Sequence, residues 1–250
     1  DFTFDLELFK NKIKNVDFSV MRELFDLREM PVPDYELLEI KKYPLATFYT
    51  SRGCPGKCRF CYNLGRQLRF YETEKVVQTI RNVLGKHNIR EFTIADDNFA
   101  NLSKRTEMIC EELAKYNGIF HIFLRVDQAH DKVLKNLKKA GCWAIQFGFE
   151  SGNQRMLNFM NKGVSVEQNA EAIKKCKKYG IFVDGSFMVG LPTETTEEMY
   201  DTVRFIEEYK PDAVDIKAYK PYPETEFYKI AIEKKLMKEL KPGARLISNY

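Results

Sequence analysis

Short β-rich runs alternate with amphipathic helical segments from residue 45 to residue 240, and this alternation limits the folds open to the chain. Runs rich in β-branched and aromatic residues are typical of buried strands, whereas apolar residues three or four positions apart predict helices. We expect strands at residues 45–50, 92–95, 119–125, 143–149, 181–189 and 213–219. Six strand–helix units in series predict a parallel α/β sheet with right-handed crossovers. Periodicity alone does not separate an incomplete β/α barrel from an open doubly wound sheet.

Several residues mark the ends of the predicted helices. Thr195 and Glu198 have the spacing of a capping box, in which two side chains bond the free backbone N–H groups of a helix start. Ser103 is the predicted N-cap of the helix after the second strand, and Gly141 is the predicted stop of the helix after the third. The last helix is expected over residues 225–240.

The predicted elements divide the chain into three parts. Residues 45–240 form the expected core, residues 241–250 a C-terminal tail, and residues 1–44 an N-terminal helical and linker segment. The N-terminal segment has apolar residues at helical spacing, namely Leu6, Phe9, Ile13 and Val16. Since residue 1 is Asp and not Met, we expect the sequence to be a piece of a longer chain.

The composition fits a soluble globular protein. A chain of 250 residues, of which 44% are hydrophobic, is long enough for one sizeable core. Its 40 basic and 36 acidic residues leave a net charge of +4, which favours neither nucleic acid nor a membrane surface as partner. No apolar run approaches the roughly 18 residues of a membrane span, and no signal peptide opens the sequence. We therefore expect a cytoplasmic protein.

Three cysteines in one short loop carry most of the chemical information. Cys54, Cys58 and Cys61 lie four and then three residues apart, directly after the first predicted strand. Three thiolates do not complete a four-ligand metal site, and the next ligand candidates, His87 and Cys110, are far along the chain. The sequence therefore predicts a metal centre with one open coordination position.

The neighbours of these cysteines support a tightly curled, metal-binding loop. Glycine and proline supply the backbone freedom and the fixed turn that such a loop needs, at Gly53, Pro55 and Gly56. Three cations should lower the thiol pKa values and offset the charge of sulfur ligands, namely Arg52, Lys57 and Arg59. The alternatives are a solvated basic loop with incidental cysteines and a zinc site completed from elsewhere. The other cysteines are expected to be structural, namely Cys110, Cys142 and Cys176.

The CxxxCxxC spacing, with the aromatic Phe60 just before the last cysteine, resembles the signature of the radical S-adenosylmethionine enzymes. The resemblance implies that Cys54, Cys58 and Cys61 hold a four-iron four-sulfur cluster, whose remaining iron binds S-adenosylmethionine. One electron, from a donor such as flavodoxin or ferredoxin, then cleaves the cofactor and yields a 5′-deoxyadenosyl radical. It also implies a partial (β/α)6 barrel of the TIM type, because six-stranded partial barrels are typical of this family.

The resemblance further implies cofactor-binding residues at the carboxyl ends of the predicted strands, where barrel enzymes place their active sites. Asp96, Asp97 and Asn98 follow the second strand, where the family binds the amino group of S-adenosylmethionine. Their alternative is an Asx-rich turn before Ser103. Arg125, at the end of the third strand, would clamp the cofactor carboxylate. Its alternative is an ion pair with Asp127 or Glu150.

The remaining predicted cofactor contacts come from later strands and from the cysteine loop. Glu150 and Ser151 match the region after the fourth strand where the family binds ribose or carboxylate groups. The end of the fifth strand, with Val189 and Gly190, resembles the segment that packs on the adenine. Phe60 and Tyr62 would flank the adenine from the cluster side, unless they are core aromatics, and Tyr219 ends the sixth strand.

Within the family, residues 31–240 look most like the barrel of the cobalamin-dependent class, which includes methylases and ring-modifying enzymes. The motifs that carry this likeness are Pro31-Val32-Pro33-Asp34-Tyr35, Glu150-Ser151-Gly152, Asn161-Lys162-Gly163, Gly190-Leu191-Pro192 and Pro221-Tyr222-Pro223. Two departures stand against it. The cobalamin-binding domain is missing, with no DxHxxG segment around any histidine, and Pro223-Glu224-Thr225 replaces the frequent Pro-Gly-Thr. We expect the three histidines to be surface residues, namely His87, His121 and His130.

The resemblance implies an enzyme that abstracts hydrogen from an unactivated C–H bond of a small molecule, for methyl transfer or for skeletal or ring modification. Cobalamin would come from a domain outside this sequence. A cobalamin-independent relative, of the methylthiotransferase or porphyrinogen oxidase kind, is one alternative. A metal-stabilised binding module without catalysis is the other.

Overall fold

A computed structural model describes residues 26–33, 35–37, 39, 42, 45–62, 67–223 and 225–237 of the chain. These residues include most of the predicted core. The helix predicted near the N-terminus and the tail at residues 241–250 lie outside the described residues. The division of the chain into three parts therefore stays a prediction.

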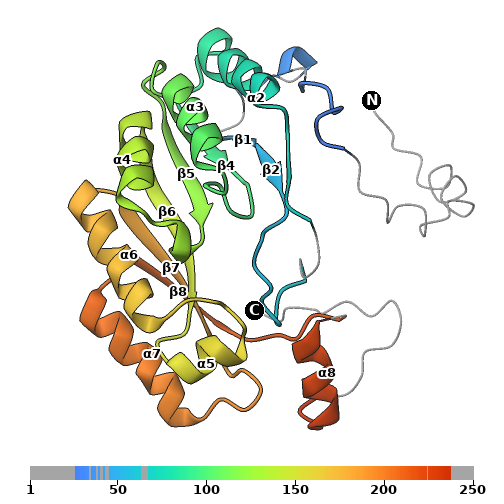
Figure 1. The fold of residues 1–250 in the computed structure, drawn as a ribbon, viewed down its shortest axis with the longest axis vertical. Coiled ribbons are helices and arrows are strands. Elements are labelled where there is room, and N and C mark those ends of the chain that lie inside the picture. Colours follow the sequence, from blue (N-terminus) through green and yellow to red (C-terminus); the bar gives the residue numbers. More distant parts are fainter. Residues whose placement is uncertain are drawn as a thin grey trace, which may run out of the picture.

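Six parallel strands form the main sheet, as predicted from the alternation of strands and helices (Figure 1). The spatial order is β1-β4-β5-β6-β7-β8, and every neighbouring pair runs parallel. Within the described part of the chain, β1 and β8 are the two unpaired edges, so the sheet does not close. The strands are β1 (Ala46–Phe48), β4 (Glu91–Ile94), β5 (Ile119–Leu124), β6 (Cys142–Glu150), β7 (Phe182–Val189) and β8 (Ala213–Ala218).

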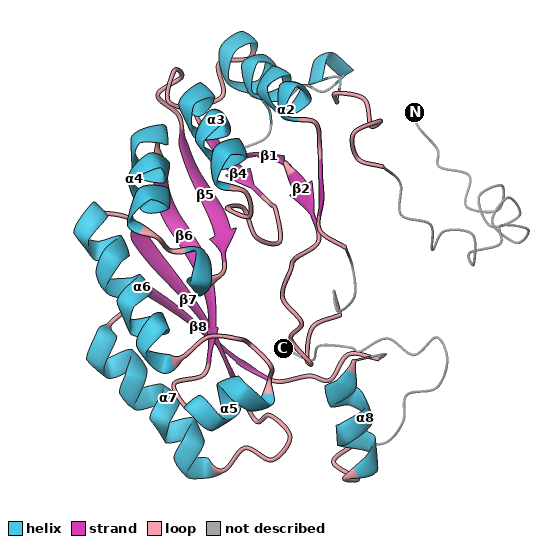
Figure 2. Cartoon of the chain, viewed as in Figure 1, coloured by secondary structure: helices cyan, strands magenta, loops and turns pink. Residues whose placement is uncertain are grey.

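Five helices cover one side of this sheet, and the segment with the three cysteines lies on the other side together with α8 (Figure 2). The five are α2 (Thr73–Ile80), α3 (Ser103–Leu113), α4 (Asp131–Ala140), α6 (Val166–Tyr179) and α7 (Thr196–Tyr209). A π-helix over Arg81–Lys86 continues α2. The shorter helices are α5 (Gln154–Phe159), α8 (Glu226–Glu233) and two 3-10 turns, η2 (Tyr35–Leu37) and η5 (Val126–Gln128).

The hydrophobic core lies between the sheet and the five helices. Successive strand residues point to opposite faces, and those that face the helices are buried aromatic or aliphatic side chains. Phe92 stacks on Phe48 and Phe120, with ring centroids 5.4 and 5.1 Å apart. Phe149 continues the aromatic row between Phe147 and Phe187. Burying each such ring contributes about 1.5–3 kcal/mol, so this layer fixes which face of every strand is left for the site.

Two of the predicted helix ends are confirmed and two are not. The Thr195–Glu198 capping box opens α7, and Gly141 closes α4 in the left-handed conformation, at φ 100°. The predicted N-cap at Ser103 is wrong, because α3 begins at Ser103 itself and Leu102 is the N-cap residue. The last helix ends at Glu233, earlier than predicted.

A two-stranded antiparallel sheet beside the main one was not predicted. Its strands, β2 (Ser51–Arg52) and β3 (Arg69–Phe70), are too short to show any periodicity in the sequence. They join the two ends of the segment that carries the cysteines. The segment is therefore a closed loop that starts and finishes at one place.

Gly152, just after β6, is a point of very close packing against α7. A Cβ atom there would lie 2.6 Å from both the Asp201 carbonyl oxygen and the Phe205 Cβ. We predict that Gly152→Ala forces α7 away from the sheet and costs about 1–3 kcal/mol of unfolding free energy, measured by urea denaturation. The control is Gly85→Ala in the π-helix, where φ is not positive and the Cβ would meet only the Tyr116 ring, at 3.1 Å. An unchanged stability of Gly152→Ala would contradict this packing.

Candidate active site

The cysteine loop curls tightly between β2 and β3. Gly53 has φ 86°, and a Cβ atom at this position would lie 2.6 Å from the Gln67 carbonyl oxygen, so the two ends of the loop approach as only glycine allows. Inside the curl, the Gly56 N–H donates to Cys54 Sγ at 3.4 Å. Cys58 is buried, and Cys54 and Cys61 are partly exposed. The predicted backbone freedom of glycine is confirmed at Gly53.

Backbone hydrogen bonds anchor the loop to two distant parts of the chain. The Arg59 N–H donates to the Met160 carbonyl oxygen at 3.0 Å, and the Phe227 N–H donates to the Arg59 carbonyl at 3.4 Å. The Asn161 side chain donates to the Lys57 carbonyl at 2.8 Å. Thus both the end of α5 and the start of α8 hold the cysteines in place over the sheet.

Two cations from the barrel reach Cys58. Arg125 Nη1 lies 3.9 Å from Cys58 Sγ, and Arg125 Nη2 donates to the Lys162 carbonyl at 2.9 Å. Burial raises the pKa of the Cys58 thiol, and the nearby charges of Lys162 and Arg125 oppose that rise. The site therefore offers positive charge to thiolates and to any anionic group they hold.

Two of the three loop cations, Arg52 and Arg59, are engaged with other partners, and the role predicted for Lys57 stays a prediction. Arg59 forms an ion pair with Glu226 at 3.1 Å, and the Arg52 guanidinium stacks on the Tyr49 ring at 3.4 Å. The cations that act most strongly on Cys58 are Lys162 and Arg125. Proximity in the sequence was therefore the wrong guide to the cations that act most strongly on Cys58.

Lys162 and Glu150 form a buried ion pair beside Cys58. Their Nζ and Oε1 atoms are 2.8 Å apart, and the side chains are 7% and 11% exposed. Glu150 sits at φ 67°, the left-handed region that a residue with a side chain seldom adopts. A Cβ at Gly148 would meet Glu150 Oε1, so the missing side chain leaves room for this carboxylate. The backbone strain and the glycine both serve to aim Glu150 at Lys162.

We predict that Lys162→Met lowers the unfolding free energy by about 3–5 kcal/mol, because it leaves the Glu150 carboxylate buried without its partner. Urea denaturation at pH 7 measures the loss. The double variant with Glu150→Gln should recover much of it, since no buried charge remains.

The matched control is Lys178→Met, which breaks an exposed ion pair with Asp131 at 3.0 Å. Such surface pairs are worth about 0–1 kcal/mol. A Lys162→Met variant as stable as this control would show that the pair with Glu150 carries no buried charge.

Asp96 is fully engaged in holding the start of the cysteine loop. Its carboxylate accepts bonds from the Thr50 and Ser51 N–H groups at 2.6 and 3.0 Å and from both hydroxyls at 2.5 and 2.7 Å. Burial raises its pKa, and these bonds oppose the rise. The buried Arg105 donates to Thr50 Oγ1 at 3.1 Å from the other side. The predicted contact of Asp96 with the amino group of the cofactor stays a prediction. The Asp96 carboxylate already accepts four hydrogen bonds from Thr50 and Ser51.

The two residues after Asp96 brace the loops around it. Asp97 accepts from the Gly53 N–H at 2.9 Å and is exposed at the rim. Asn98 is buried; its oxygen accepts from the Arg125 N–H at 2.8 Å, and its amide donates to Asn101 at 2.6 Å. Asp97 is thus the exposed member of the trio.

Arg125 pairs with Asp127, one of the two alternative partners named from the sequence. Its guanidinium forms an ion pair with Asp127 at 3.0 Å. The same group faces the cysteine loop so closely that a Cβ at Gly56 would lie 2.7 Å from Nη1. A clamp on the cofactor carboxylate stays a prediction, and it would have to share this guanidinium with Asp127.

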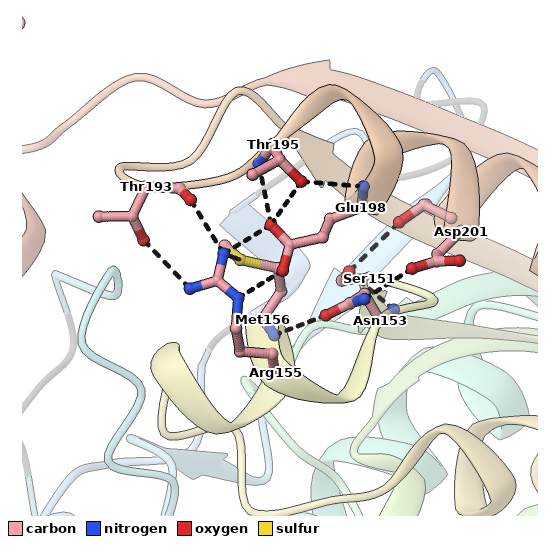
Figure 3. A network of polar contacts seen from close by, with 9 residues as sticks. Ser151, Asn153, Arg155, Met156, Thr193, Thr195, Glu198 and Asp201 are labelled. Carbon is pink, nitrogen blue, oxygen red and sulfur yellow. Dashed lines mark hydrogen bonds and ion pairs between the residues drawn. The ribbon is translucent and has the colours of Figure 1, made fainter.

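Ser151 belongs to a polar network that fixes the ends of β6 and β7 (Figure 3). Its hydroxyl bonds to Thr202 Oγ1 at 3.2 Å, while Asn153 bonds to Asp201 at 2.6 Å and caps α5. Arg155 pairs with Glu198 and donates to the Thr193 carbonyl at 2.9 Å. The network connects the loop after Gly190 to α5. The predicted contact of Ser151 with ribose stays a prediction.

The Arg155–Glu198 pair generates a pH dependence. The hydrogen bond from Arg155 holds the pKa of Glu198 at about 2, below its usual value of 4.5. A depressed pKa stabilises the fold above pH 4.5, and that contribution is lost as the pH falls toward 2. We predict that Glu198→Gln lowers the melting temperature at pH 7 and that the gap to the parent chain closes between pH 4.5 and 2.

The neighbouring Glu197→Gln is the control, because Glu197 forms only an exposed ion pair with Arg204. It should change the melting temperature little at any pH. A gap for Glu198→Gln that stays constant with pH would refute the proposed charge contribution.

The predicted aromatic contacts meet at α8. Phe60 packs on Phe227, with centroids 6.5 Å apart, and Tyr219 meets the same ring edge-on at 5.7 Å. Burial raises the pKa of Tyr219 to about 12. Tyr62 is 60% exposed and lies near Tyr222. Phe60 and Tyr219 thus share one apolar cluster, whereas Tyr62 lies outside it.

The end of β7 has the shape expected for close approach of a ligand. Gly190 has φ 76°, and nothing lies within 4 Å of the position of its Cβ. The Tyr219 N–H donates to the Val189 carbonyl at 2.8 Å and so extends the pairing of β7 with β8. Their contact with the adenine stays a prediction.

The residues around the loop fit an iron–sulfur cluster. All six cysteines are free thiols, so Cys54, Cys58 and Cys61 are not linked to one another. The donors are three thiols of one curled loop, with an N–H···S bond, the buried Lys162 and the partly buried Arg125 nearby. Thiolate donors with hydrogen bonds and compensating charge are what such clusters need.

Sequence reasoning missed Lys162 and Asn161 as parts of this site. The run Asn161-Lys162-Gly163 was a signal as one of the motifs that carry the family likeness, but the sequence assigned it no role in the site. Lys57 and Asn161 are 104 positions apart in the sequence. A contact at that separation leaves no local pattern from which it could be predicted.

Comparison with known proteins assigns the class. The family model of the Radical SAM superfamily matches residues 48–206, more than half of the chain. The chain therefore belongs to the radical S-adenosylmethionine superfamily. No helix in the described segments is long and apolar enough to span a membrane.

Two curated relatives show which members it resembles. An uncharacterized methyltransferase of Pyrococcus horikoshii is 33% identical over 220 residues, which cover 84% of this chain and 48% of the relative. The anaerobic magnesium-protoporphyrin IX monomethyl ester cyclase of Rubrivivax gelatinosus is 31% identical over 209 residues, covering 78% of this chain and 38% of the relative. The chain spans about half the length of these relatives, or less.

Two solved structures confirm the partial barrel. The methyltransferase TsrM from Kitasatospora setae has a TM-score of 0.69 at 17% identity, covering 80% of this chain and 41% of TsrM. The cobalamin-dependent S-adenosylmethionine radical enzyme OxsB has a TM-score of 0.66 at 27% identity, covering 85% of this chain and 34% of OxsB. Both are cobalamin-binding members of the superfamily, as the motifs indicated.

Proposed function

We propose that this chain is the catalytic barrel of a radical S-adenosylmethionine enzyme for methyl transfer or ring modification of a small molecule. The observation that carries the proposal is the three-cysteine loop, closed at Gly53 and held against Arg125 and Lys162. A cluster bound there, with S-adenosylmethionine, supplies the 5′-deoxyadenosyl radical that removes hydrogen from an unactivated C–H bond.

The chain's own residues would orient and neutralise these groups. Cys54, Cys58 and Cys61 are the proposed cluster ligands. Lys162 and Arg125 place positive charge beside the buried thiolate, which offsets the negative charge of the ligands. At the rim, Asp97 and Gly190 are the groups best exposed for the amino group and the adenine of the cofactor.

The proposed partners follow from the same chemistry. Reductive cleavage consumes an electron, for which flavodoxin or ferredoxin is the proposed donor. Cobalamin is the proposed second cofactor, because TsrM and OxsB were solved with cobalamin bound; a domain outside this sequence would provide it. A putative methylthiotransferase of Methanocaldococcus jannaschii, 32% identical over 71% of the chain, keeps a cobalamin-independent activity as the second candidate. A cytoplasmic location stays a prediction.

Anaerobic reconstitution with iron and sulfide tests the proposal. We expect about four irons and four sulfides per chain, and 5′-deoxyadenosine only when both S-adenosylmethionine and a reductant are present. Cys58→Ala should lose the iron and the product while the melting temperature stays near that of the parent chain.

The control is Cys176→Ala, since Cys176 is a buried residue of α6, far from the loop in the sequence; it should keep both iron and product. Retained zinc together with unfolding of Cys58→Ala would instead support a structural metal module, because such sites supply folding energy.

A further inference from the structure

The face of the sheet opposite the helices is mixed. It carries polar side chains together with the apolar Phe123, Phe182 and Met188, and Phe123 pairs with Gln146. Strand alternation places there Thr93, His121, Gln146, Asp184, Ser186 and Asp215, and each is partly accessible. The residues between them on the same strands face the helices, and on β4 to β7 they are buried aromatic or aliphatic groups or Gly185. We call His121, Gln146, Asp184, Ser186 and Asp215 the inner polar face.

The parallel register brings these residues into adjoining rows. Gln146 pairs with Asp184, and Ser186 pairs with Asp215. Gln146 Nε2 donates to Ser186 Oγ at 2.8 Å. The small Ala144 lies between His121 and Phe182 in the next row, so no large side chain of β6 separates His121 from β7.

The inner polar face leads up to the cysteine loop. Gly148, the next inward position of β6, pairs with Ser186, and a Cβ there would lie 3.0 Å from Lys162 Nζ. Lys162 Nζ in turn lies 6.0 Å from the ring centroid of Phe60, a residue of the cysteine loop. A small molecule on the inner polar face would therefore lie between the strands and the proposed cluster, where the proposed reaction needs it.

The charges on this face select among ligands. Asp215 forms an ion pair with Lys217, whose Nζ lies 2.6 Å from Asp215 Oδ2. Among the described residues, no group donates a hydrogen bond to the Asp184 carboxylate, which is only partly exposed. Burial lowers the pKa of His121, with Asp184 opposing, so this imidazole is largely neutral at pH 7. A partly buried carboxylate without a donor favours a ligand that brings one.

We propose that the inner polar face binds the substrate through amino or hydroxyl groups that donate to Asp184, and that it excludes substrates that present a carboxylate there. The inference rests on the proposed function, because it takes the ligand of this face to be the substrate. Asp184 is the proposed specificity residue, and His121 and Gln146 flank it as further hydrogen-bonding groups. A carboxylate on the ligand would face Asp184 with like charge and no donor.

Two probes of matched shape and opposite charge test this selectivity. Benzylamine and benzoate are titrated into the full chain at pH 7, and the imidazole signals of the three histidines are followed by NMR. His121→Gln assigns the His121 signal. We expect benzylamine to shift that signal saturably, and benzoate to leave it unchanged.

Asp184→Asn should weaken benzylamine binding about tenfold, since a charge-assisted hydrogen bond is lost. Asp131→Asn, on the surface of α4, is the matched control and should bind as the parent chain does. If Asp184→Asn fails to fold, Ser186→Ala, which disturbs the Gln146 bond, should still reduce binding. Equal binding of the two probes, or unchanged binding in Asp184→Asn, would overturn the inference.

Neither cluster nor S-adenosylmethionine enters this measurement. The titration is repeated on Cys58→Ala, where binding should persist. Loss of product in reconstitution with intact probe binding would thus reject the proposed function alone. Product formation with no difference between the probes would reject the inner polar face alone.

Discussion

The contact between the cysteine loop and the barrel is the constraint on which the site depends. A short loop cannot bury its sulfur atoms by itself. Hydrogen bonds to the Met160 carbonyl, the Asn161 amide and the Phe227 N–H hold it against the barrel. Arg125 then spans the gap, with one nitrogen on Cys58 and the other on the Lys162 carbonyl. The Arg125 guanidinium contacts both Cys58 and Lys162. A shift of Lys162, in the connection between β6 and α6, would therefore also move the guanidinium beside the Cys58 thiol.

Buried charge is the recurring means of fixing this region. Asp96 and Arg105 meet around Thr50 where the loop begins, and Glu150 and Lys162 meet where it rests. Burying either pair costs desolvation free energy, and this cost is offset only when each charge has its partners. Such pairs specify one arrangement of the rim, since any displaced loop would leave a charge unpaired.

The fold was largely predictable, because strand and helix periods are local properties of the sequence. All six strands, the capping box at Thr195 and the stop at Gly141 followed from spacing alone. The contacts of the site were less predictable. The three cysteines stand out in the sequence, but the cations beside Cys58 come from positions far along the chain, and Asp96 turned inward to Thr50. Long-range side-chain geometry has no periodic signal.

An unclosed sheet leaves backbone groups ready to pair with another chain. Within the described residues β8 bonds only to β7, and its Val214 and Ile216 are 40% and 47% exposed. Edges of this kind invite strand addition and aggregation unless charge or a cover protects them. Here Asp215 and Lys217 alternate with the apolar pair, which makes β8 a poor template for a growing fibril while its hydrogen-bonding edge stays open.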